Sequence, residues 1–172
     1  MARTRLSPEK WIAAGFDALA RTGPQALAAE PLARALKTTK GSFYWHFKDV
    51  PAFQGALITA WQAQALQHVV TAVQQTGDAD VRLRAFGQGV LADPVEPQLR
   101  IWAQADTRAA AALREVDEER LEFISRLLSA MGLSNVNFAR AIQATLTGLP
   151  LMANASDTAP FETLVDTILA LE

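Results

Sequence analysis

The segment Thr38–Lys48 constrains the fold of this chain more than any other stretch. It gathers aromatic rings, His46 and two lysines directly after an amphipathic segment and a short polar break. Phe43 and Phe47 are four residues apart, so they share one face of a helix, and we expect both in a small core. The remaining side chains then project outward, as on a short helix that lies against a phosphate backbone. The segment therefore predicts a helical head that presents one helix to a nucleic acid.

The rest of the chain is predicted to be helical as well. Apolar residues recur at helical spacing, and glycine and proline mark the breaks between segments. No segment shows the alternation typical of a strand, so we expect an all-α fold of about nine helices. Ser7, Thr39 and Ser134 are the expected N-terminal caps. The expected helices cover residues 8–22, 29–36, 40–46, 51–75, 80–91, 99–106, 108–131, 135–153 and 161–171, with a loop over 154–160.

The first three helices form a helix-turn-helix pattern, with a tight turn between the second and third. The second helix is expected to bury Leu32, Ala35 and Leu36. Lys37 falls in this turn.

Charge is distributed unevenly along the chain. The net charge is −2, yet residues 1–50 carry eight basic and four acidic side chains, while residues 51–172 carry eight arginines and fourteen acids. A basic head on an acidic body is typical of a protein that touches a polyanion with one end, although clustering by chance remains the alternative.

Composition excludes several kinds of function. There is no cysteine, so disulfides, thiolate zinc sites and cysteine nucleophiles are absent, and two distant histidines predict no metal site. We find no nucleophile–base constellation and no phosphate loop, so we expect no enzyme and no cofactor. No run is long enough to span a membrane and no signal core follows the N-terminus, so the expected location is cytoplasmic.

The residues Leu32-Ala33-x-x-Leu36 and Thr39-Lys40-Gly41-Ser42-Phe43-Tyr44-Trp45-His46-Phe47-Lys48-Asp49 carry a family resemblance. Over about residues 7–61 the chain resembles the TetR (tetracycline-repressor-like) family of transcriptional regulators. The resemblance implies a DNA-binding domain over residues 1–50 and a helical regulatory and dimerisation domain over 51–172. The family usually has glycine in the turn where Lys37 stands, so Lys37 would need a left-handed backbone or a different turn geometry. The resemblance also implies a homodimer whose third helices enter successive major grooves of a palindromic operator, and a small-molecule inducer that binds the body and releases the double-stranded DNA.

Residues at the start of the third helix can reach base edges, and later ones suit phosphate and sugar. Gly41 would let the backbone approach DNA, or is only a poor helix former tolerated near an end. Trp45 could instead pack on the following helix, and His46 could cap the third helix or fill a polar slot. The expected DNA-binding residues are Thr39, Lys40, Gly41, Ser42, Tyr44, Trp45, His46 and Lys48.

Residues of the body are candidates for a ligand pocket, which needs mostly apolar walls and few polar groups. The candidates are Trp61, His68, Phe86 and Trp102, and plain core packing is the alternative for each aromatic. Gly87 and Gly89 either loosen their helix or mark close packing. The acidic run over residues 115–122, interleaved with Arg114 and Arg120, predicts a solvated helix face.

The last two long helices carry more apolar surface than one helix face needs, which predicts a four-helix dimer interface. The residues concerned are Phe138, Ala141, Ile142, Thr145, Leu146, Leu149, Phe161, Leu164, Val165, Ile168 and Leu169. The sequence therefore predicts a ligand-responsive transcriptional repressor. The alternative is a helical protein-interaction module that retains the head fold without binding an operator.

Overall fold

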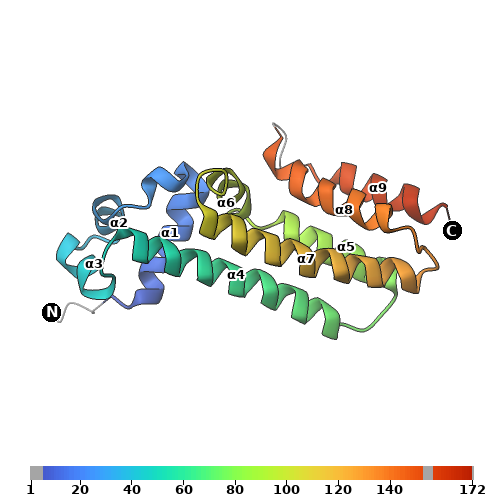
Figure 1. Ribbon diagram of the computed structural model, residues 1–172, viewed down its shortest axis with the longest axis horizontal. Helices are drawn as coiled ribbons and strands as arrows, with labels where there is room; N and C mark the ends of the chain where they lie inside the picture. Colours follow the sequence, from blue (N-terminus) through green and yellow to red (C-terminus); the bar gives the residue numbers. More distant parts are fainter. Residues whose placement is uncertain (1–5, 153–156, 172) are drawn as a thin grey trace. The chain divides into compact units, whose positions relative to one another are not determined.

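The structure is a computed structural model that describes residues 6–152 and 157–171. These residues contain nine α-helices, two short 3-10 turns and no strand, which confirms the all-α prediction (Figure 1). The 3-10 turns cover Pro24–Ala26 and Leu149–Leu151. The helices are α1 (Pro8–Thr22), α2 (Ala29–Ala35), α3 (Lys40–His46), α4 (Val50–Gln74), α5 (Ala79–Leu91), α6 (Glu96–Trp102), α7 (Thr107–Ala130), α8 (Val136–Gly148) and α9 (Ala159–Leu169).

Most helix bounds agree with the sequence to within two residues, and the exceptions are α6 and the end of α8. Helix α6 was expected over residues 99–106, but it begins at Glu96 because Pro97 falls in the first turn, where proline is tolerated. Helix α8 was expected to reach residue 153, but it ends at Gly148, because Pro150 has no backbone N–H to continue the helix and lies in the following 3-10 turn. The expected loop over 154–160 lies partly outside the described residues, and its last two residues already belong to α9.

Two of the three expected caps differ in the structure. Thr39 accepts a hydrogen bond from the Ser42 backbone N–H at 3.4 Å and caps α3 as predicted. Ser7 occupies the capping position of α1, but its side chain makes no capping bond. Ser134 is not the cap of α8; Asn135 is, because it stands next to the first helical residue and accepts from Asn137 N–H at 3.0 Å.

The chain forms two compact units. Unit 1 consists of Met1–Ala63 and Val95–Leu113, and unit 2 consists of Gln64–Pro94 and Arg114–Glu172. Helices α4 and α7 each contribute residues to both units. These units are defined by packing and do not coincide with the expected functional domains, 1–50 and 51–172. The division into functional domains stays a prediction.

Helix α2 buries Leu32 fully and Leu36 partly, as expected, but it does not bury Ala35. Ala35 is exposed, whereas Ala29, Leu32 and Ala33 are buried and Leu36 is partly buried. Positions 29, 32, 33 and 36 follow the spacing i, i+3, i+4, i+7 of one helix face, and Ala35 lies off that face.

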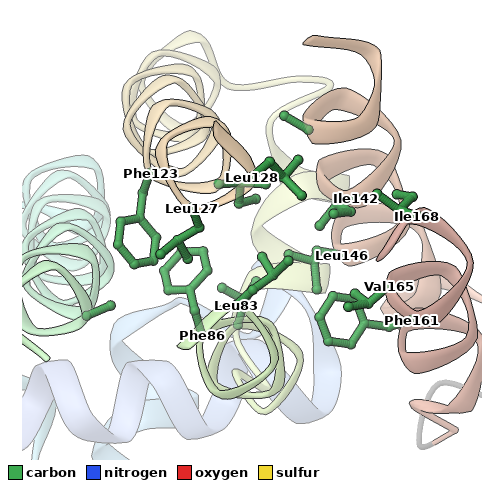
Figure 2. Close-up of a cluster of buried hydrophobic side chains, with 14 of the residues drawn as sticks. Leu83, Phe86, Phe123, Leu127, Leu128, Ile142, Leu146, Phe161, Val165 and Ile168 are labelled. Carbon is green, nitrogen blue, oxygen red and sulfur yellow. The ribbon is translucent and has the colours of Figure 1, made fainter. Parts of the chain in front are cut away.

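Five helices (α4, α5, α7, α8 and α9) contribute to the core of unit 2, and Figure 2 shows its side chains converging between helices. Phe86 of α5 and Phe123 of α7 meet edge to face, with ring centroids 4.8 Å apart. The labelled residues are Leu83 and Phe86 from α5, Phe123, Leu127 and Leu128 from α7, Ile142 and Leu146 from α8, and Phe161, Val165 and Ile168 from α9.

Helix α9 is attached to α5 by a close contact and an ion pair. A Cβ at Gly87 would collide with the Phe161 ring, so this glycine marks close packing. The Arg84 guanidinium lies 2.6 Å from both the Glu162 and the Asp166 carboxylates. Hydrogen bonds to these two acids raise the pKa of Arg84.

The acidic run of α7 is exposed as expected except at Asp117, which is partly buried, and one arginine of the predicted solvated face is buried. Glu115, Glu118, Glu119 and Glu122 face solvent. Arg120 is only 3% exposed. It lies four residues after buried Val116 and four before buried Ile124, so it shares their core-facing side. The prediction of a fully solvated face was therefore wrong at this position.

Candidate nucleic-acid interface

Helix α3 is held in place by a cluster of aromatic rings within unit 1. Phe43 contacts Trp11 of α1 and Phe53 of α4, each with ring centroids 5.3 Å apart. Phe47 contacts Phe53 at 5.0 Å. Phe43 and Phe47 are both buried, which confirms that they belong to the core. Edge-to-face pairs of this kind have specific geometry, so they orient the helix as well as bury it.

Helix α1 also packs directly on the start of α4. A Cβ at Gly15 would collide with the side chains of Leu57 and Phe53. The absence of a side chain at this position lets the two helices approach closely. Figure 1 shows α1, α2 and α3 grouped beside the first turns of α4.

The turn between α2 and α3 contains a non-glycine residue in a left-handed conformation. Lys37 has φ of 52°. This confirms the expectation that a lysine at this position would need such a backbone, which costs about 1–2 kcal/mol for an L-residue. The turn is closed by Thr38 N–H, which donates to the Ala33 carbonyl at 2.8 Å.

The start of α4 is anchored to the start of α7 within unit 1. The Arg108 guanidinium donates to the Pro51 carbonyl at 3.0 Å and to Asp106 Oδ2 at 2.7 Å. The hydrogen bond to Arg108 lowers the pKa of Asp106. Asp49 caps α4 through a 2.7 Å hydrogen bond from Ala52 N–H. The segment that follows α3 is therefore held at several points.

The outward side of α3 carries the residues that the sequence assigned to DNA. Trp45 is 70% exposed and Tyr44 is 53% exposed, so both side chains can reach a partner. The other six are Thr39, Lys40, Gly41 and Lys48, which are exposed, and Ser42 and His46, which are partly buried. The structure thus brings all eight residues to one short segment of unit 1.

Gly41 has no packing role inside the protein. A Cβ at this position would meet Thr39 Oγ1 at 3.7 Å, which is an ordinary contact. Alanine would fit the fold and would favour a helix more than glycine does.

Sequence reasoning missed an acidic residue beside this surface. Glu30, in the first turn of α2, lies 2.8 Å from the Lys40 ammonium and 3.5 Å from the Arg34 guanidinium. The hydrogen bond between Glu30 and Lys40 lowers the pKa of the carboxyl and raises that of the amine. A pair ten residues apart depends on how α2 and α3 cross, so no sequence spacing signals it.

The candidate ligand residues divide between the two units. His68 and Phe86 meet in unit 2 as stacked rings with centroids 5.1 Å apart, and burial lowers the pKa of His68. A Cβ at Gly89 would come within 2.5 Å of the His68 ring, so this glycine also marks close packing. Trp61 and Trp102 are buried residues of unit 1.

A small pocket of unit 2 lies between the end of α7 and the start of α8, and none of the four candidates lines it. Its volume is about 70 Å³, and its walls include Ser125, Ser129, Leu133 and Asn135. Ligand pockets usually measure about 300–1,000 Å³. This pocket is therefore too small for a drug-sized molecule.

Among residues 6–152 and 157–171, no three histidine or acidic side chains gather as metal ligands. The same part of the chain has no helix that is both long and apolar enough to cross a membrane.

Comparisons with known proteins agree with this architecture. No family model matches the chain. The tetracycline repressor protein class A from transposon 1721 of Escherichia coli is 30% identical over 160 residues, which cover 90% of this chain and 70% of that protein. The TetR transcriptional regulator from Legionella pneumophila has the same fold, with a TM-score of 0.79, 15% identity and 99% of each chain covered. The reduced form of NemR from E. coli is similar in fold too, with a TM-score of 0.75, 19% identity and 94% of each chain covered. With its helix-turn-helix head, its all-α fold and this degree of identity to a tetracycline repressor, the chain belongs to the TetR family of transcriptional regulators.

Proposed function

We propose that this protein is a ligand-responsive transcriptional repressor that binds a palindromic operator as a homodimer. The observation that carries the proposal is the outward side of α3, where exposed cations and rings surround a glycine that the fold does not need. The relative from transposon 1721 bears the name of a repressor.

The residues of α3 divide into two kinds of contact. Thr39, Lys40 and Ser42 lie at the start of the helix, from which side chains of a recognition helix reach base edges. Gly41 lets the helix approach the groove closely. The later residues contact phosphate and sugar, and so they position the head without reading the base sequence. These residues are Tyr44, Trp45, His46 and Lys48.

Dimerisation uses apolar side chains of α8, of the 3-10 turn after it and of α9 that pack against the core of unit 2 but stay partly exposed. Ile142 and Val165 are buried in unit 2, whereas Phe138, Leu149 and Leu164 remain partly exposed although they are large and apolar. Two copies of the helix pair would cover these side chains in a four-helix bundle. The two-fold axis then sets the spacing of the α3 helices to about one turn of DNA, or a multiple of it.

Release by a ligand would act through α4. This helix begins four residues after α3 and contributes residues to unit 2, where His68 stacks on Phe86. A ligand that prefers one tilt of α4 would shift the heads out of operator register, and it can do so only through its different affinities for the two states.

The test is a selection of bound duplexes from a random DNA pool, followed by salt titration of the selected sequence. A repressor enriches a palindrome whose half-sites are about one DNA turn apart. Lys48→Gln should then reduce the salt slope by about 0.9 for each head, because one phosphate contact is lost. Failure to bind any duplex at low ionic strength would refute the proposal and favour a protein-interaction module.

Ligand response needs its own measurement. Candidate small molecules that bind the protein are added to the operator complex, and affinity is compared with and without each. If every molecule that binds leaves operator affinity unchanged, the ligand-response part of the proposal is wrong.

A further inference from the structure

One carboxylate pairs with two cations next to the proposed DNA-reading surface. Glu30 Oε2 lies 2.8 Å from Lys40 Nζ, and Glu30 Oε1 lies 3.5 Å from Arg34 Nη2. Each of the three side chains is more than half exposed, so none is held there by burial. An exposed ion pair contributes little to folding. The ion pair can still change the affinity for DNA, because the phosphates compete with Glu30 for the same cations.

The position of each member explains why the pair forms. Lys40 is the first residue of α3, where the positive end of the helix dipole disfavours a cation. Glu30 stands in the first turn of α2, where the same effect favours an acid. The carboxylate thus offsets an unfavourable site for the lysine, and the ammonium is held at a defined place beside Gly41.

We infer that Glu30 is a positioning residue that restrains Lys40 from general phosphate contact and thereby sets the preference of the head for its operator over other DNA. The inference rests on the proposed function. Non-specific binding depends on cations that neutralise phosphates and release counterions. A lysine already paired with a carboxylate contributes less to this non-specific binding.

Operator contact is compatible with the pair. A lysine ammonium has three donors, so one can remain on Glu30 while another donates to a base-edge acceptor in the major groove. A correct sequence supplies that acceptor at the place where the ammonium is held. Other sequences do not supply it, so there Lys40 stays paired with Glu30 and adds less to binding.

Glu30→Gln removes the charge while it keeps the size of the side chain. The freed Lys40 gains a phosphate contact, so the salt slope should steepen by about 0.9 for each head and about 1.8 for a dimer. When salt rises from 50 to 200 mM, the affinity of the variant for DNA should fall by a factor about tenfold larger than the factor for the wild type. Binding to unrelated duplexes at low salt should strengthen more than binding to the operator, so the specificity ratio should fall.

The experiment titrates salt against the full chain bound to the selected operator and to a scrambled duplex. It compares the wild type with Glu30→Gln, Lys40→Gln and the double variant, and thermal unfolding verifies that each is folded. Asp17→Asn is the matched control, since Asp17 is an exposed acid of α1 outside the proposed surface. We expect a steeper slope for Glu30→Gln, no such steepening when Lys40 is already replaced, and an unchanged slope for Asp17→Asn.

Two results would overturn the inference while the proposed function stands. In one, the wild type binds its operator but Glu30→Gln has the same slope and specificity ratio. In the other, Glu30→Gln changes the slope equally with and without Lys40, which would mean that the carboxylate acts by its own repulsion of phosphate. If no variant binds DNA at 50 mM salt, the proposed function fails and the inference fails with it. Binding by Glu30→Gln but not by the wild type would also refute the proposed function, and with it the inference.

Discussion

Replacing Gly41 with alanine should make the protein more stable and a weaker DNA binder. The added Cβ meets only Thr39 Oγ1, at 3.7 Å, so the fold accepts it without strain. Glycine within a helix is less favourable than alanine by about 0.5–1 kcal/mol. For a chain of 172 residues, this predicts a melting temperature higher by about 1–4 °C.

The same methyl group would stand between the first turn of α3 and the DNA. If it prevents one good base contact in each half-site, operator binding weakens by about 1–3 kcal/mol per half-site. Thermal unfolding followed by circular dichroism measures the first effect, and fluorescence anisotropy with labelled operator measures the second. The two effects have opposite signs, so general damage to the fold cannot produce both.

Gly55→Ala is the matched control for this experiment. Gly55 lies within α4, and a Cβ there would meet Arg108 Nη1 at 3.5 Å, an ordinary contact. This variant should be stabilised in the same way and should bind operator like the wild type. If Gly41→Ala also binds operator with unchanged affinity, Gly41 is only a poor helix former and the argument for close approach is refuted.

Three further variants test the packing and the electrostatics of the fold. Gly87→Ala forces the buried Phe161 ring to move, so it should destabilise the protein by about 1–3 kcal/mol. Gly148→Ala has open space around its Cβ and should not destabilise the protein. Thermal unfolding compares the two variants. Burial lowers the pKa of His68 below 6.5, so the neutral imidazole contributes its full stability above pH 6.5. This contribution is lost as the pH falls from 6.5 toward the pKa of the folded state. Urea unfolding between pH 7.5 and 5 should show that His68→Gln lacks this loss of stability. Asp106→Ala removes the side chain that accepts from two backbone N–H groups at the start of α7, which should cost about 1–2 kcal/mol in urea unfolding.

Each of these expectations has a contrary result. Equal stability of Gly87→Ala and Gly148→Ala would mean that the aromatic ring is not confined. Parallel pH profiles for the wild type and His68→Gln would mean that the imidazole titrates alike in the folded and unfolded chains. An unchanged urea midpoint for Asp106→Ala would show that another group satisfies the helix start.

The proposed interface could be recognised from the sequence because its signals are local. The spacing of Phe43 and Phe47 predicted which side of a short helix enters the core, and both residues are buried. Thr39 was predicted to cap that helix and does so. Such features depend on residues within one or two helical turns, where helix geometry alone decides which side chains are neighbours.

Predictions went wrong where a helix had two plausible faces or starts. Arg120 follows the charge pattern of its neighbours but lies on the buried side of α7. Helix α6 begins earlier than expected because proline is compatible with a first turn as well as with a break. In both cases the local sequence permits two structures, and packing against other helices selects one.

The order of residues along this chain thus specified the all-helical fold, the head and the family resemblance, because hydrophobic spacing and capping act over a few residues. Contacts between distant parts of the chain required the folded structure. The Glu30–Lys40 pair depends on the crossing of α2 and α3, and the fit of Phe161 over Gly87 depends on the packing of α5 against α9. A side chain's position on its own helix follows from the sequence, but its partner on another helix follows only from how the two helices pack.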